Sequence, residues 1–307
     1  MVGIAALLLS APPPDLMFAL AKRVQRPPRI DGRIEPGEWP PFVKEPFWDI
    51  FATPDRPARE GTSFSICYDD KALYIAAICE EPKPEGLVKL VTWHDGPVYQ
   101  DDSIEVFLDT NHDHKTYFHF VANCIGTRFE EFVTDKSWDA NWLAAASIGR
   151  KEWTLEMAIP FSALKARPKE GDVWGFNICR EHWAHGVKEI SAWSLTRGGF
   201  HNPKAFGHLI FGTARPVMRR AAEEALREAA SFERRAADEL RQLRGSREAE
   251  EFLAALSKVR GIASRWRELP PDDPKALSNL LRELSQARKG LEKAFWALKF
   301  AALFAED

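Results

Sequence analysis

The sequence predicts a mainly β protein, an antiparallel β-sandwich of the jelly-roll or immunoglobulin-like kind, followed by a C-terminal three-helix hairpin or bundle. Three observations predict this fold. Residues 29–212 contain short runs of alternating polar and apolar residues, separated by turn residues. These runs are not separated by helical segments of the kind that connect parallel strands. Beyond Pro216, apolar residues recur at helical spacing instead.

Residues 1–28 are expected to form a leader, or a signal segment, with a linker. The stretch 1–11 is apolar and ends in small residues, as a short signal sequence does, but it lacks the usual cationic start. A disordered leader is the alternative. Export would make the protein secreted or periplasmic. Because no run approaches the ~18 apolar residues that span a bilayer, we do not expect an integral membrane protein.

Residues 29–212 are predicted to form one β-sandwich. The clearest signal is a hairpin of 63–68 and 72–79, which are joined by the polar turn Asp69-Asp70-Lys71. Further strands are expected at 103–109, 116–124, 127–133, 153–159, 173–180, 189–194 and 205–211.

Two of these strands are predicted to have one apolar face each, because side chains alternate in direction along a strand. The core-facing residues are expected to be Ile104, Val106, Leu108, Phe118, Phe120, Ala122 and Cys124. The opposite faces mix aromatic, carboxylate, imidazole and amide groups, at Ser103, Glu105, Phe107, Asp109, Tyr117, His119, Val121 and Asn123. Such a surface suits a sugar, whose C–H faces pack on rings while its hydroxyls bind polar groups. An ordinary polar outer face is the alternative.

Residues 213–307 are predicted to be helical, at 217–244, 247–269 and 275–305. Gly245-Ser246 and the prolines at 270–274 separate these segments. Apolar residues follow a coiled-coil-like seam, and the alanines of the first segment allow close approach of a neighbour. That neighbour is either another helix of the chain or a second subunit, so a homo-oligomer is one expectation.

The distribution of charged residues and tryptophans also differs between the predicted β region and the predicted helical region. Nine of the eleven tryptophans precede residue 200, and residues 214–307 carry a net charge of +3 against −6 for the rest. An acidic, tryptophan-rich region without a basic stripe argues against nucleic-acid binding. The four cysteines lack CxxC spacing and lie in apolar runs, which favours buried free thiols over a zinc site or a redox pair.

Seven segments, in order along the chain, resemble carbohydrate-binding module family 9 and the wider DOMON-like group. They are IDGRIEPGEW at 30–39, YDDKALYI at 68–75, DDSIEVFLD at 101–109, VAN at 121–123, WTLEMAIP at 153–160, WGFN at 174–177 and SAW at 191–193. Members of the family are β-sandwiches that accompany polysaccharide-degrading enzymes. They hold the ends of sugar chains between two aromatic rings, beside polar groups and structural calcium. The resemblance implies non-catalytic binding of a mono- or oligosaccharide or a polysaccharide chain end, in extracellular or periplasmic carbohydrate catabolism.

The resemblance also implies site residues. Tyr99 stands where the family has a tryptophan, six residues before the ligand-binding carboxylate Glu105, and Asn123 matches a sugar-binding asparagine. Trp183 would be the second aromatic ring, with Arg180 as a polar contact.

This sequence departs from the family at three of these positions. Tyrosine replaces tryptophan at 99, Val121 replaces the usual arginine, and Arg180 replaces an amide. We expect His119, on the same strand face, to compensate for the arginine.

A calcium site is expected at Asp109, Asn111 and Asp113, because oxygen ligands alternate there as in calcium loops. The alternative is a turn that these side chains cap. An EF-hand loop is excluded, since its glycine position is His114.

Three other classes of function need to be considered. Asp101, Asp102 and Glu105 could supply the carboxylates of a glycoside hydrolase, but without a second acidic motif no enzyme is expected. Some DOMON-like domains carry electrons on a haem held by Met or His. Met157 reads as a core residue between Leu155 and Ile159, so no haem is expected. A structural protein that oligomerises through its C-terminal helices is the remaining alternative.

Overall fold

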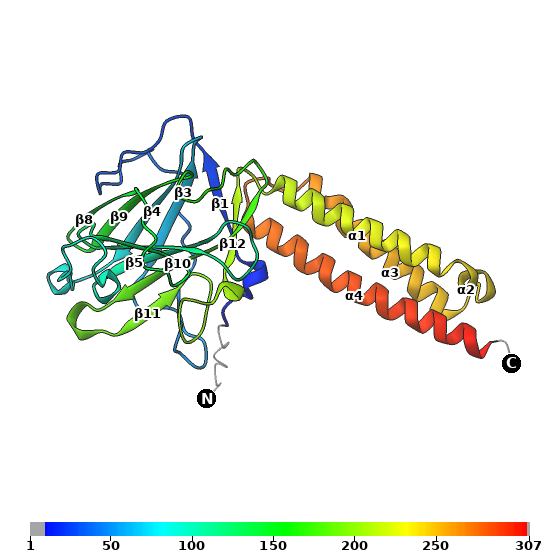
Figure 1. Ribbon diagram of the computed structural model, residues 1–307. Helices are drawn as coiled ribbons and strands as arrows, with labels where there is room; N and C mark the ends of the chain where they lie inside the picture. The colour runs from blue at the N-terminus through cyan, green and yellow to red at the C-terminus, as the bar shows by residue number, and fades with distance from the viewer. Residues whose placement is uncertain (1–9, 306–307) are drawn as a thin grey trace. The chain divides into compact units, whose positions relative to one another are not determined.

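The computed structural model describes residues 10–305 and divides at Gly212 into a β unit and a helical unit (Figure 1). The apolar start of the predicted signal segment lies mostly outside the described residues. In the described chain, no helix is both long and apolar enough to cross a membrane.

The β unit contains twelve strands within the described residues. They are β1 (Phe18–Arg23), β2 (Trp48–Asp49), β3 (Thr62–Tyr68), β4 (Ala72–Glu80), β5 (Ser103–Asp109), β6 (Phe118–Asn123), β7 (Arg128–Phe132), β8 (Leu143–Ile148), β9 (Glu152–Pro160), β10 (Val173–His182), β11 (Glu189–Ala192) and β12 (Gly207–Phe211). A short 3₁₀ turn, η1 (Pro14–Leu16), precedes β1, and others lie between later strands, at η2 (Pro84–Gly86), η3 (Val98–Gln100), η4 (Ala184–Gly186) and η5 (Pro203–Ala205).

The strands pair in the order β7-β6-β5-β10-β12-β1-β3-β4-β9-β8, with β11 and β2 attached beside β10. The mainly β prediction is therefore confirmed, and so is the hairpin of β3 and β4. The all-antiparallel prediction is wrong for β1, which pairs in parallel with both β12 and β3. The reason is that β1 enters between two strands that already run in its own direction.

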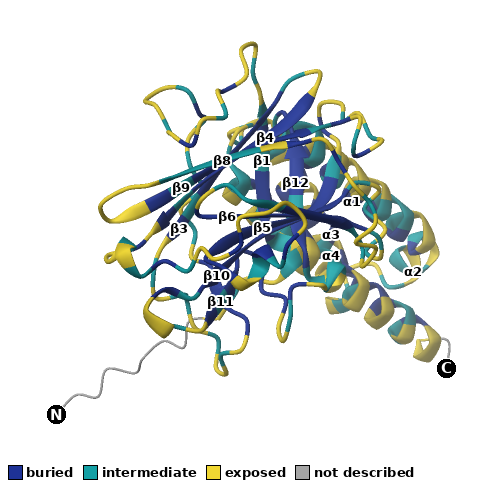
Figure 2. Cartoon of the chain, turned by 60° about the vertical axis from the view of Figure 1, so that its left-hand side comes forward, coloured by how far each residue is buried: buried dark blue, intermediate teal, exposed yellow. Residues whose placement is uncertain are grey.

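One apolar core lies between the two halves of this sheet. Phe64 of β3 packs against Phe176 of β10 with ring centroids 5.9 Å apart, although these strands are not hydrogen-bonded neighbours. All seven core residues predicted for β5 and β6 lie in this core, as do Trp153 and Trp174. Figure 2 shows the strands of the unit mostly in the colour of buried residues.

The predicted leader contains a central strand. Phe18–Arg23 lie within the expected leader 1–28, yet they form β1, whose Ala19 and Ala21 are fully buried in the core. Phe18-Ala19-Leu20-Ala21 are all apolar, so no period-two pattern distinguishes this strand from the apolar leader expected there. Strand β8 was also missed, because its Leu-Ala-Ala-Ala-Ser-Ile sequence has a weak strand propensity.

Most of the outer face of β5 and β6 is buried rather than solvated. Loops cover it and form a second apolar cluster that includes Phe107, Tyr117, Phe200 and Phe206. The four cysteines are free and buried, as predicted. Burial raises the pKa of Cys67, Cys79 and Cys124 to about 12, so these thiols are unreactive at neutral pH.

The helical unit has four α-helices in its described part rather than three. They are α1 (Arg215–Arg235), α2 (Ala237–Gln242), α3 (Arg247–Ser264) and α4 (Pro274–Phe304), with the 3₁₀ turn η6 (Arg265–Arg267) after α3. The predicted first helix breaks at Ala236, whose φ of −98° and ψ of 2° are not helical. Asp238 and Glu239 follow, and acidic residues favour a new helix N-terminus there. The three long helices pack against one another through the predicted apolar seams.

Candidate functional site

A pocket of about 350 Å³ lies on the outer face of β7, β6, β5 and β10. The strand pleat places one side chain after another along its floor: Phe129 and Glu131 from β7, His119 from β6, Glu105 from β5 and Glu181 from β10. His119 lies directly opposite Glu131 on one side and Phe107 on the other. Four neighbouring strands thus turn three carboxyl groups and an imidazole toward one cavity.

His119 is the centre of the polar floor. Its Nε2 lies 2.7 Å from Glu105 Oε2, and its Nδ1 lies 2.9 Å from Glu131 Oε1. Its ring stacks on Phe107, with centroids 4.1 Å apart and planes inclined by 11°. Both nitrogens and one ring face are therefore fixed, and the imidazole has one orientation.

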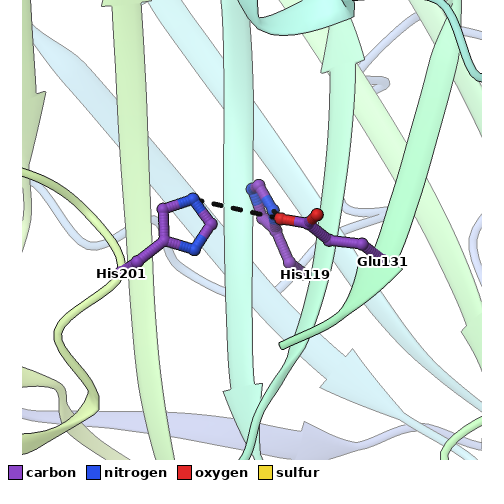
Figure 3. Close-up of side chains that lie close together, drawn as sticks. All are labelled: His119, Glu131 and His201. Atoms are coloured by element: carbon purple, nitrogen blue, oxygen red, sulfur yellow. Dashed lines mark hydrogen bonds and ion pairs between the residues drawn. The ribbon is translucent and has the colours of Figure 1, made fainter. Parts of the chain in front are cut away.

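His201 joins this group from the loop before η5. Its Nε2 lies 3.9 Å from Glu131 Oε1, and its Nδ1 is hydrogen-bonded to the Tyr117 hydroxyl at 2.8 Å. Figure 3 shows His119 and His201 directed toward the Glu131 carboxylate. Unlike the other two, His201 is half-exposed, with 46% of its side chain accessible.

The buried charges set the protonation of the floor. Burial lowers the pKa of His119, but Glu105 and Glu131 outweigh burial and the net shift is upward. Burial raises the pKa of Glu131, but the hydrogen bond and charge of His119, together with the charges of His201 and Lys136, outweigh burial and the net shift is downward. Burial, with the charges of Glu105 and Asp102, raises the pKa of Glu181 to about 9. At neutral pH Glu181 is therefore a protonated carboxyl group that can donate as well as accept a hydrogen bond.

The rim of the pocket is aromatic and basic. Phe51, which follows β2, is 63% exposed, and Tyr99 of η3 packs edge-on against Phe129 at 5.8 Å. The Lys136 ammonium lies 5.4 Å from the centre of the Tyr99 ring. The pocket thus offers apolar ring surface near its mouth and hydrogen-bonding groups on its floor.

Comparison with known proteins identifies the family of the β unit. Residues 30–213, more than half of the chain, match the family described as carbohydrate family 9 binding domain-like. The chain belongs to this family. No curated protein sequence matches it.

Solved structures similar to this family 9-like chain include a carbohydrate-binding module family 9 of Caldicellulosiruptor kristjanssonii. The module in complex with glucose is 20% identical, with a TM-score of 0.48, and covers 64% of this chain and 95% of its own. The same module in complex with cellotriose is 18% identical, with a TM-score of 0.48; the match covers 64% of this chain and 94% of the module. A putative carbohydrate-binding protein from Bacteroides uniformis is 19% identical, with a TM-score of 0.49; the match covers 63% of this chain and 98% of that protein.

Three of the six predicted ligand residues of this family 9-like domain line the pocket, namely Tyr99, Glu105 and His119. Asn123 does not. Its amide donates to Val91 O and Asp101 Oδ2, while its Oδ1 accepts from the backbone N–H groups of Ile125 and Thr127. Its hydrogen bonds hold two loops together.

Arg180 points to the opposite side of β10 from the pocket. Its guanidinium donates to Gly61 O, Thr62 Oγ1 and Glu80 O in the buried interior. Trp183 also lies outside the pocket lining, just after β10, where its backbone N–H donates to Asp102 Oδ1.

The predicted calcium residues form a hydrogen-bonded turn. Asp109 accepts from the N–H groups of Asp113 and His114, and Asp113 accepts from those of Lys115 and Thr116. The hydrogen bonds from Thr116 and Lys115 lower the pKa of Asp113 to about 2. These contacts are those of the turn-cap alternative, and a calcium ion there stays a prediction.

The pocket also contains residues that the sequence reasoning missed. Glu181 has the plainest signal, since it continues the pleat of 173–180 on the face opposite Arg180. Glu131 needs the pairing of β7 with β6 to be placed beside His119. Phe51 and His201 lie on loops, whose course the strand pattern does not predict.

Proposed function

We propose that the β unit, as a sandwich-type module, binds carbohydrate without catalysis in the pocket lined by Tyr99, Glu105 and Glu181. The observation that carries the proposal is the combination of exposed ring surface and an ammonium group at the rim with carboxyl and imidazole groups on the floor. Apolar rings cover the C–H faces of a pyranose, and the polar groups bind its hydroxyls. Membership of the carbohydrate family 9 group supports the same ligand class.

Different side chains of the pocket would make different contacts with a sugar. Phe51 and Tyr99 provide ring surface, and Lys136 donates hydrogen bonds from the rim. Glu105 accepts, and Glu181, protonated at neutral pH, both donates and accepts. The hydroxyl groups of a sugar both donate and accept hydrogen bonds, so they need acceptors and donors in the pocket.

Calorimetric titration with glucose and cellotriose tests the proposal. We expect Tyr99→Ala and Phe51→Ala each to weaken binding about two- to tenfold, the effect of roughly 0.5–1.5 kcal/mol per aromatic contact. Trp93→Ala is the matched control, because Trp93 is 58% exposed and does not line the pocket. Equal affinity of the wild type and both pocket variants would place the sugar elsewhere.

Trp183→Ala separates this pocket from the site that the family resemblance implies. Binding through the pocket predicts that this variant keeps the affinity of the wild type, because Trp183 does not line it. A loss in Trp183→Ala without one in Tyr99→Ala would instead favour the family-like position.

We further propose that the protein is exported and acts beside polysaccharide-degrading enzymes. Detection of the full chain, expressed with its own N-terminus, in the periplasm or medium supports export, and retention in the cytoplasm contradicts it.

The calcium site predicted at Asp109, Asn111 and Asp113 is tested by measuring the melting temperature with CaCl₂ and with a chelator, using Asp113→Asn as the variant. A structural calcium ion predicts a rise in melting temperature that this variant loses.

The helical unit favours self-association as a second role. Trp296, Phe300 and Leu303 of α4 are exposed apolar residues at spacings of four and three, so they share one face of the helix. We expect light scattering to show an oligomer of the full chain that Phe300→Glu dissociates. An unchanged monomer in both proteins would remove this role.

A further inference from the structure

We propose that His119, Glu131 and His201 form a binding site for a divalent metal ion of the zinc class on the floor of the pocket (Figure 3). The site is distinct from the calcium site predicted at Asp109, Asn111 and Asp113. It adds a metal to the pocket proposed for sugar and does not require that a sugar binds there.

The three ligand atoms already lie close together. One candidate atom from each residue falls within 4.8 Å of the others. Around a tetrahedral zinc ion with bonds near 2.1 Å, ligand atoms are ~3.4 Å apart. The distances to Glu131 Oε1, 2.9 Å from His119 Nδ1 and 3.9 Å from His201 Nε2, lie on either side of that value. Shifts of about half an ångström would complete the coordination.

Each histidine has a partner on its other nitrogen. Glu105 Oε2 contacts His119 Nε2 at 2.7 Å, and the Tyr117 hydroxyl contacts His201 Nδ1 at 2.8 Å. Metal-binding histidines are held in this way, because a carboxylate or oxygen acceptor on one nitrogen fixes the tautomer and turns the other nitrogen toward the metal. The stacked ring of Phe107 further fixes His119.

A fourth, buried group in the pocket points independently to a ligand. Glu181 lines the same cavity and is more than nine-tenths buried, and its Oε2 has no hydrogen-bond partner. Buried polar atoms in proteins are nearly always paired, so an unpaired carboxyl oxygen facing a cavity indicates a polar ligand there. A water or sugar hydroxyl on the metal would be such a partner.

The ligand set selects the class of metal. Two imidazoles with one carboxylate suit zinc and its neighbours, whereas calcium and magnesium prefer oxygen ligands alone. Three protein ligands leave at least one coordination position open, and the half-exposed His201 gives the ion a path from solvent.

The test measures metal bound to the full chain in the absence of sugar. After dialysis against a chelator and titration with ZnCl₂, we expect one zinc ion per chain, and Co²⁺ in its place should give the visible spectrum of a low-symmetry site. His201→Ala should lose this binding, while His185→Ala, an exposed histidine outside the pocket, should keep it.

A second variant pair tests the supporting hydrogen bond. Tyr117→Phe keeps the ring and removes the hydroxyl that contacts His201, so we expect roughly 10–100-fold weaker zinc binding. Tyr74→Phe, which removes a buried hydroxyl bonded to Asp69, should bind zinc as the wild type does.

Three outcomes overturn the metal site: no zinc retained by the wild type, equal binding in His201→Ala, or a preference for Mg²⁺ over Zn²⁺. Failure of the sugar proposal remains separable, because Tyr99→Ala removes ring surface and no proposed ligand. Zinc binding preserved in a protein that binds no sugar would support the metal site alone.

Discussion

Trp39 donates its indole Nε1 hydrogen to Oε1 of Glu156, 2.9 Å away, within the β unit. The other oxygen of this fully buried carboxylate accepts the backbone N–H groups of Asp31 and Gly32, at 2.9 and 2.8 Å. Burial raises the pKa of Glu156, although all three hydrogen bonds act to lower it. One side chain of β9 therefore holds the segment 31–39, which carries the first of the family-like motifs.

Glu156→Ala should destabilise the protein by about 3 kcal/mol, because it leaves three donors unpaired, two of them backbone N–H groups. Glu156→Gln should cost less, since its amide oxygen still accepts. Urea unfolding measures both variants, with the exposed Glu152→Ala on the same strand as the control. A cost for Glu156→Ala no greater than that of the control would contradict the structural role.

Alanine substitutions at Gly32 and Gly37 distinguish the cost of backbone strain from the cost of a steric clash. Their φ values are nearly equal, +83° and +82°, but a Cβ on Gly32 would lie 2.6 Å from the backbone of Ala146, whereas one on Gly37 meets open space. Gly37→Ala should therefore cost only the ~1–2 kcal/mol of left-handed strain. Gly32→Ala should cost more than that by thermal or urea unfolding. Similar losses in the two variants would argue against the close approach.

Arg180 should contribute to the stability of the folded protein rather than to ligand binding. Arg180→Ala removes a buried guanidinium that contacts three oxygen atoms, and we expect a loss of about 2–4 kcal/mol. Lysine should not restore it, because one ammonium lacks the planar fork that reaches all three. The exposed Arg197→Ala is the control. A folded Arg180→Ala that binds sugar more weakly than the wild type would show a ligand role instead.

His208 should make stability depend on pH. It stacks on Phe18, with a centroid distance of 4.9 Å, and Nδ1 lies 3.0 Å from His112 Nε2. Burial, with the charges of His112 and His114, lowers its pKa to about 4, while Asp15 acts weakly against this shift.

The folded state therefore keeps His208 neutral where the unfolded chain binds a proton. Stability should fall as the pH drops from 6.5 to about 4, by about 3 kcal/mol from this residue. His208→Gln should lose correspondingly less over that interval when urea unfolding is measured at a series of pH values. Parallel pH profiles for the two proteins would exclude His208 as the cause.

Pleat alternation accounts for what the sequence could predict. Strand β5 has the predicted bounds, and the core faces of β5 and β6 are correct, because strict period-two patterning determines both. The same reasoning placed Glu105 and His119 on one face. It could not place Glu131 or Glu181 beside them, since that requires the order of strands in the sheet. Phe51 and His201 depend on loop paths, which local periodicity does not encode.

The position of β1 has a consequence for how the protein is made. Its partners are β3 and β12, so the first described strand of the unit completes its pairing only with the last one. Contacts between such distant parts of a chain form slowly. Throughout synthesis of the intervening residues, the apolar strand Phe18–Arg23 must remain without β12. We therefore expect the nascent chain to depend on a chaperone until Gly207–Phe211 emerges.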